Sequence, residues 1–348
     1  MPKASIGISG SNSGAMRSSG LPAAVLFFAT AVCASSFARG QENSQQPQQT
    51  IQVSVDRVNV GVIVTDLRGQ FVEGLRREDF RVFDNGIEQP ITGFAAVEEP
   101  AQVLLLIEAG PAVYLLEGGH VQAAVALLNG LSTDDRVAVV KYADSPTALL
   151  DFTADKQAAR TAFGELRFNL GFGSLNLTSS VSKVLEWLAS VRDKKTIVLL
   201  TTGVDTSPTN EFALAMQQLK VSDVRLLAVS LAGNLQNPQP VGKKKSPAAN
   251  SNKAAEEFEK ANQLLKRMAE STGGRAYFPT TAKEFTSVYA EIAQLVRHEY
   301  SLAFAPPAHD GLVHSIEVRV EAPQKPEASA SGSAYRVDHR RAYLAPPG

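Results

Sequence analysis

The hydrophobic pattern of this chain centres on a short apolar run at residues 103–107, Val-Leu-Leu-Leu-Ile, which ends at Glu108. Small residues and Pro111 follow the acidic side chain. An unbroken apolar run closed by turn formers is typical of a strand that is buried on both faces and leads into a loop. In open α/β sheets, ligands bind at the carboxyl ends of such strands. Glu108 is therefore the first candidate for a functional residue.

Strand and helix patterns alternate from this run onward. The predicted strands cover residues 103–107, 136–142, 148–152, 196–201, 224–231 and 275–278. The predicted helices cover residues 119–129, 156–168, 177–191, 210–220, 254–271 and 282–297. This alternation predicts an α/β fold, doubly wound, with a mainly parallel sheet and helices on both faces. Residues 233–253 interrupt the alternation, and we interpret them, with their three lysines at 243–245, as a solvated loop insertion.

Both ends of the chain instead follow the two-residue period of half-buried strands. Before the α/β domain at 101–297, such strands lie in residues 51–98, and Pro90 places the strand at 87–95 at a sheet edge or a bulge. After it, residues 298–345 contain strands at 300–304, 314–320 and 334–343. We expect these N- and C-terminal flanking strands to form one Ig-like β-sandwich, with the α/β domain inserted between its halves. Two separate β extensions are the alternative.

The N-terminal region has the features of an export signal. Lys3 and Arg17 precede an apolar run at 21–34, and small residues stand at Ser36 and Ala38. This pattern predicts a signal peptide over residues 1–38, and thus an exported protein of the periplasm, cell surface or medium. A disordered tail and a membrane anchor are the alternatives. Residues 39–50 are polar and rich in glutamine, which predicts a disordered linker.

Charge and cysteine content limit the possible partners and chemistry. Cys33 is the only cysteine, so cleavage after Ala38 leaves a mature chain with neither disulfides nor a thiol nucleophile. A formal net charge of −1 gives no reason to expect nucleic acid or an anionic membrane as partner. No stretch after the signal is long and apolar enough to predict a membrane span.

Sequence signatures of catalysis and of metal binding are missing. The five histidines never approach the His-x-x-x-His spacing, and we interpret His309 and His314, which flank a predicted turn, as surface residues. The chain has neither a Gly-x-Ser-x-Gly elbow nor a phosphate-binding glycine motif. We therefore expect a protein that is not an enzyme and has no cofactor. Three loops at the carboxyl edge of the predicted sheet remain as candidates: 108–112, 171–176 and 201–205.

Several motifs carry a family resemblance. They are residues 60–66 (Val-Gly-Val-Ile-Val-Thr-Asp), 84–86 (Asp-Asn-Gly), 103–110, 197–205 (Ile-Val-Leu-Leu-Thr-Thr-Gly-Val-Asp), 297–302 (Arg-His-Glu-Tyr-Ser-Leu) and 310–311. With the order of the predicted elements, they resemble the von Willebrand factor type A (VWFA) domain. More specifically, residues 51–345 resemble the VWFA-related family of exported bacterial proteins, common in Acidobacteria. The resemblance implies a Rossmann-like A-type fold with a metal-ion-dependent adhesion site (MIDAS).

That site has the first-loop pattern Asp-x-Ser-x-Ser, a threonine in the second loop and an aspartate in the third. Its hard oxygen ligands suit Mg²⁺, which keeps waters and a position for a partner's carboxylate. This sequence departs from the pattern at every position, where it has Glu108, Gly110, Ala112, Leu175 (or Ser174) and Thr202, with Asp205 nearby. We therefore expect a degenerate, metal-free adhesion site and a function in binding an unknown protein partner.

Two other functions remain open. The first is a ligand-binding module that depends on Mg²⁺ or Ca²⁺ and uses Glu108, Ser174, Thr202 and Asp205 as an unorthodox site. The second is a hydrolase that uses Glu108 and Asp205 as a carboxylate pair.

Overall fold

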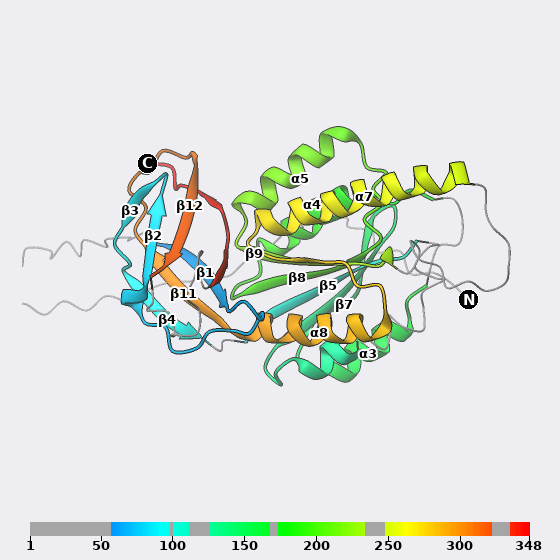
Figure 1. Ribbon diagram of the computed structural model, residues 1–348, viewed down its shortest axis with the longest axis horizontal. Helices are drawn as coiled ribbons and strands as arrows, with labels where there is room; N and C mark the ends of the chain where they lie inside the picture. The colour runs from blue at the N-terminus through cyan, green and yellow to red at the C-terminus, as the bar shows by residue number, and fades with distance from the viewer. Residues whose placement is uncertain (1–56, 98–99, 111–124, 168–172, 234–247, 322–334) are drawn as a thin grey trace, which may run out of the picture. The chain divides into compact units, whose positions relative to one another are not determined.

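The strand predicted at 103–107 is the third strand from one edge of a six-stranded central sheet in the computed structural model (Figure 1). This strand, β5 (Gln102–Glu108), is buried at every residue. The other strands are β6 (Arg136–Tyr142), β7 (Pro146–Thr153), β8 (Lys195–Thr201), β9 (Val224–Ser230) and β10 (Ala276–Tyr277), in the order β10-β9-β8-β5-β6-β7. All neighbouring pairs are parallel except the β6–β7 hairpin. The prediction of a mainly parallel sheet is confirmed.

Amphipathic helices cover both faces of this sheet. On one face α3 (Lys156–Gly164) and α8 (Ala282–Arg297) pack into a hydrophobic cluster with β5, β6, β8 and β9 (Figure 1). On the other face lie α4 (Leu177–Leu188), α5 (Thr209–Val221) and α7 (Ala248–Ser271). Alternate residues of β5 serve the two faces, since Leu105 faces the first cluster and Leu106 the second. This two-sided burial explains the unbroken apolar run.

The flanking strands form two four-stranded antiparallel sheets, as predicted. One sheet has the order β13-β1-β11-β4 and the other β14-β12-β2-β3. From the N-terminal side come β1 (Val58–Thr65), β2 (Phe80–Asp84), β3 (Ile87–Gln89) and β4 (Gly93–Val97), with a 3-10 turn at Arg77–Asp79. From the C-terminal side come β11 (Glu299–Phe304), β12 (Val313–Val320), β13 (Arg336–His339) and β14 (Ala342–Leu344). Both sheets contribute to one hydrophobic cluster, so they form a sandwich in which the two chain ends are interleaved.

Two predicted strands are each divided between these sheets, which corrects the sequence prediction. The strand expected at 87–95 is broken after Gln89, and its halves, β3 and β4, lie at the edges of different sheets. Pro90 stands at the break, where its missing N–H costs no ladder hydrogen bond. The strand expected at 334–343 is likewise broken after His339 into β13 and β14.

The structure describes residues 57–97, 100–110, 125–167, 173–233, 248–321 and 335–348. The predicted signal peptide, linker and lysine run, the start of the helix at 119–129 and Ala112 lie outside them. Helix α7 begins at Ala248, so the loop predicted at 233–253 ends earlier than expected. His314, expected at the surface, is buried, whereas His309 is exposed. Among the described helices, none combines the length and apolarity required to cross a bilayer.

Candidate functional site

The candidate site lies where three neighbouring strands of the central sheet end. Glu108, Tyr142 and Thr201 are the last residues of β5, β6 and β8. The parallel register pairs Glu108 with Tyr142 and Ile107 with Leu200, which places Thr201 beside Glu108. The sheet thus brings three polar side chains together at its carboxyl edge, on both sides of β5.

The Glu108 carboxylate is completely buried, with 0% of the residue exposed. Its Oε2 accepts hydrogen bonds from Thr201 Oγ1 at 2.8 Å, the Thr202 backbone N–H at 2.7 Å and Thr202 Oγ1 at 2.8 Å. The Thr202 hydroxyl also lies 3.0 Å from Oε1, and Tyr142 Oη lies 3.4 Å from Oε2. Donors of the protein itself therefore surround this carboxylate.

The hydroxyl of Thr201 links the other groups of the site. It donates to Glu108 and lies 2.6 Å from Tyr142 Oη, while the backbone N–H of Gly203 donates to it at 2.9 Å. Because its one proton goes to Glu108, we assign Tyr142 as the donor to Thr201. Burial raises the pKa of Glu108, and the hydrogen bonds from Thr202, Thr201 and Tyr142 oppose this shift. Burial and the adjacent Glu108 charge raise the pKa of Tyr142 well above its ordinary value.

Gly110 and Leu175, two positions that the sequence comparison assigns to the adhesion-site motif, lie against each other. A Cβ on Gly110 would come 2.9 Å from Leu175 Cδ2 and 3.1 Å from Glu108 Oε1. The Leu175 side chain, which is half-buried, therefore occupies space that a serine at position 110 would need. Ser174 is exposed, and no hydrogen bond of its side chain to Glu108 is present among the described residues.

Asp205 stabilises the second and third loops. Its Oδ1 accepts hydrogen bonds from the backbone N–H groups of Leu177 and Ser207, both at 3.0 Å. Leu177 is the first residue of α4. The N-cap residue of this helix, Asn176, makes no side-chain cap hydrogen bond, so Asp205 supplies the acceptor from another loop. Thr206 adds further bonds between the loops, to the N–H and C=O of Leu175. Among the described contacts, none joins the carboxylates of Asp205 and Glu108.

The sequence does not single out Tyr142, and it includes Thr201 only as the first residue of the candidate loop at 201–205. Tyr142 lies inside a predicted strand, and a search for loop motifs passes over the last residue of a strand. The available signal was a polar residue at the end of an apolar strand, the same signal that drew attention to Glu108.

The donor arrangement does not fit the magnesium ion that the motif implies. Mg²⁺ requires near-octahedral oxygen ligands, and binding here would require Glu108 to give up several short hydrogen bonds. Thr202 presents a proton to Glu108, Leu175 presents methyl groups, and Gly110 has no side-chain oxygen. Among the described residues, no three His, Cys, Asp or Glu side chains gather closely enough to bind a metal.

Comparison with known proteins agrees with the A-type arrangement of this sheet and its loops. Residues 120–291 match the von Willebrand factor type A domain family. The chain contains a von Willebrand factor type A domain. The matched segment starts after β5, so it leaves out Glu108. No curated protein matches this chain.

Solved structures to which the chain is similar include several bacterial proteins. A von Willebrand factor type A protein from Catenulispora acidiphila is 11% identical, with a TM-score of 0.44, covering 77% of this chain and 74% of that one. An aerotolerance-related membrane protein from Bacteroides fragilis is 12% identical, with a TM-score of 0.42 and coverages of 57% and 98%. The PilB minor pilin from Streptococcus sanguinis is 13% identical, with a TM-score of 0.41 and coverages of 60% and 63%.

Proposed function

We propose that this VWFA domain is a non-enzymatic interaction module that binds a protein partner without a metal ion, at the carboxyl edge of its sheet. Such domains are suited to protein interaction, and this edge is where open α/β sheets bind ligands. The observation that carries the metal-free part is the set of donors around Glu108. We also propose that the protein works outside the cytoplasm, on the basis of its N-terminal signal pattern.

The physical argument concerns what a partner meets at this edge. In a metal-dependent site, the partner's carboxylate completes the coordination of the ion. Here Glu108 has no exposed surface, and Leu175 and the third loop lie around it. A partner would therefore contact the outer surface of the loops, which includes the exposed side chains of Ser174 and Val204. Recognition would then depend on shape and apolar contact.

Titration calorimetry with Mg²⁺, Mn²⁺ and Ca²⁺ tests the metal-free part. We expect no binding by the wild-type chain at millimolar concentrations. A variant with the motif restored, E108D/G110S/A112S/L175T/T202D, serves as the positive control and should gain affinity for Mg²⁺ or Mn²⁺. Binding by the wild type that is lost in Glu108→Ala would overturn the proposal and favour the metal-dependent module.

A capture experiment tests the interaction itself. The mature chain is cross-linked in an envelope extract, and the partner recovered is then expressed and titrated directly. We expect Val204→Asp, at the carboxyl edge, to weaken this binding at least tenfold, whereas Leu214→Asp, on an exposed position of α5, leaves it unchanged. EDTA should have no effect. Equal weakening by both variants, or a loss of binding in EDTA, contradicts the proposal.

A further inference from the structure

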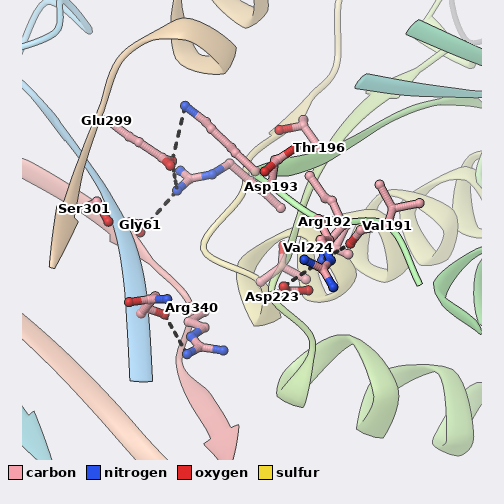
Figure 2. A pocket seen from close by; sticks show the side chains of 15 residues that line it. Gly61, Val191, Arg192, Asp193, Thr196, Asp223, Val224, Glu299, Ser301 and Arg340 are labelled. Atoms are coloured by element: carbon pink, nitrogen blue, oxygen red, sulfur yellow. Dashed lines mark hydrogen bonds and ion pairs between the residues drawn. The ribbon is translucent and has the colours of Figure 1, made fainter. Parts of the chain in front are cut away.

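A cavity of about 570 Å³ lies at the opposite edge of the central sheet, where β8 and β9 begin. Its walls come from the loop before β8, the starts of β8 and β9, and sandwich strands β1 and β11, which contribute Asn59, Gly61, Glu299 and Ser301. Figure 2 shows side chains from both sides facing this space. Its volume falls within the range of small-molecule sites. None of the residues of the Glu108 site lines it.

Two buried cations in this cavity share one carboxylate. Lys194 Nζ lies 3.5 Å and Arg225 Nη2 3.2 Å from the same oxygen, Oε2 of Glu299 (Figure 2). The exposed fractions of the three side chains are 8%, 8% and 12%. Charges are rarely buried without a partner of opposite sign, and this group has one positive charge in excess. Burial lowers the pKa of Lys194 and so disfavours its charged form. A bound anion would have the opposite effect and stabilise the charged form.

The other acidic groups of the cavity do not remove this excess. Asp223 pairs with Lys195, at 2.7 Å. Asp193 is exposed, as is Arg192 beside it. Arg340 adds a further cation, and its Nη2 donates to the backbone carbonyl of Asn59 at 2.6 Å. The lining therefore holds five basic side chains and three acidic ones, with the excess on the α/β side.

Three polar atoms that line the cavity have unused hydrogen-bonding capacity. Lys194 Nζ, Thr196 Oγ1 and Arg340 Nε are buried and lack a hydrogen-bond partner within the part of the chain that the structure describes. Buried polar side chains normally find partners in native proteins. Two of these three atoms are cationic donors, and the third is a hydroxyl that can donate. An oxyanion would satisfy Lys194 and Thr196, whereas Figure 2 shows Arg340 beyond Gly61, well away from both Thr196 and the Glu299 carboxylate.

We propose that this cavity binds a small molecule through a carboxylate or phosphate group. The oxyanion accepts hydrogen bonds from Lys194 and Thr196, and neutralises the charge that Glu299 leaves unbalanced. Because the sandwich contributes Glu299 and Arg340 to the walls of the cavity, the bound molecule would contact both domains. This cavity and the Glu108 site lie at opposite edges of the sheet, so ligand binding here is independent of the proposed protein interaction.

Titration calorimetry with inorganic phosphate and with citrate tests this site in the full chain, at low and matched ionic strength with chloride as the reference anion. The two probes separate phosphate recognition from carboxylate recognition. We expect at least one to bind, and Lys194→Met to weaken it at least tenfold. Lys183→Met, the same change at an exposed lysine of α4, should leave the affinity unchanged.

Two further variants keep the test decisive if Lys194→Met does not fold. Thr196→Val is nearly isosteric and should weaken binding several-fold, because it removes one donor. Glu299→Gln removes the carboxylate that competes for Lys194 and Arg225, so it should strengthen binding about tenfold. A purely structural role for these residues would not produce opposite effects. Absence of binding by the wild type to both anions at millimolar concentrations, or unchanged affinity in both variants, overturns the proposal.

Discussion

The hydroxyl of Thr202 donates to both carboxylate oxygens of Glu108, at 2.8 and 3.0 Å, and its backbone N–H donates at 2.7 Å. The motif of the related domains has an acid at each of these positions, and a metal ion would screen their repulsion. In this chain the third-loop acid is replaced by a donor, so the remaining acid is held by hydrogen bonds instead. The two departures from the motif are therefore complementary, since each makes the other physically acceptable.

Removing the Glu108 carboxylate should destabilise the domain. Glu108→Ala leaves the buried Thr202 N–H and two hydroxyls without their acceptor, at a cost of about 2 kcal/mol in the free energy of unfolding. Glu108→Gln keeps one acceptor oxygen and removes a buried charge, so we expect its stability at neutral pH to stay within about 1 kcal/mol of wild type or to exceed it. Urea unfolding of the three chains measures this. Equal loss in both variants would contradict it.

The same carboxylate should make stability depend on pH. Burial raises the folded-state pKa of Glu108 above its unfolded value, so the folded state binds this proton more tightly. The stability that Glu108 contributes is fully present below its pKa in the unfolded chain. It is lost as the pH rises through its pKa in the folded protein. The stability of wild type relative to Glu108→Gln should therefore fall over that interval. Denaturant midpoints of both chains from pH 4 to 8 give the difference curve, and a curve of opposite slope would exclude a raised pKa.

A methyl group at position 110 should interact unfavourably with Leu175. Gly110→Ala brings a Cβ to 2.9 Å from Leu175 Cδ2 and 3.1 Å from Glu108 Oε1, and we expect it to cost about 1 kcal/mol. The terminal methyl groups of Leu175 can move, whereas hydrogen bonds hold the Glu108 carboxylate in place. In a Leu175→Ala background the cost should fall by half or more, which a double-mutant cycle detects. Strictly additive effects would show that Leu175 does not occupy this space.

His339 should make the sandwich sensitive to acid. Its Nε2 accepts hydrogen bonds from the Val318 N–H and from Arg341, and its Nδ1–H donates to the Arg340 carbonyl. Burial, with a smaller effect of the Arg341 charge, lowers its pKa to about 4.

A histidine whose pKa is lowered in the folded protein contributes its full stability above its pKa in the unfolded chain. That contribution is lost as the pH falls toward its pKa in the folded protein. We expect a loss of about 3 kcal/mol between pH 6.5 and 4, which unfolding curves across that range would show. His339→Gln should remove most of this dependence. The same change at exposed His309 should keep it.

Arg275 should contribute strongly to stability through the contacts it makes on both domains. Its guanidinium donates to Asp338 Oδ2 at 2.8 and 2.5 Å, to Thr65 Oγ1 at 2.9 Å and to Glu291 at 2.9 Å. Arg275→Met leaves the buried Asp338 with Arg336 as its ion-pair partner among the described residues, and we expect a loss of about 3 kcal/mol.

Arg275→Lys should recover only part of this loss, because an ammonium lacks the two-pronged geometry. Arg76→Met, at an exposed ion pair with Glu78, is the control and should change stability by less than about 0.5 kcal/mol. Equal effects at both arginines, measured by urea unfolding, would contradict the expectation.

The sequence by itself determined the α/β domain and the edge of the sheet where the candidate site lies. The run at 103–107 is apolar at every position because both faces of β5 are covered, and this is visible without knowing what covers them. Helix α8 has its predicted bounds, Ala282–Arg297, because an amphipathic period and a Thr281 cap are local signals. The sequence also shows where the chain departs from the adhesion-site motif, at Glu108, Gly110, Leu175 and Thr202.

Only the tertiary structure decided where the strands divide and what the polar residues contact. Nothing near Pro90 or Arg340 in sequence specifies that the chain changes sheet there, since the partner strands come from the other end of the chain. Burial of His314 follows from its contact with Asp84, 230 positions away. The donors around Glu108 likewise come from β6 and β8, and Lys194 meets Glu299 only across the two domains. Local patterns encode elements, whereas these contacts depend on long-range packing that no local period records.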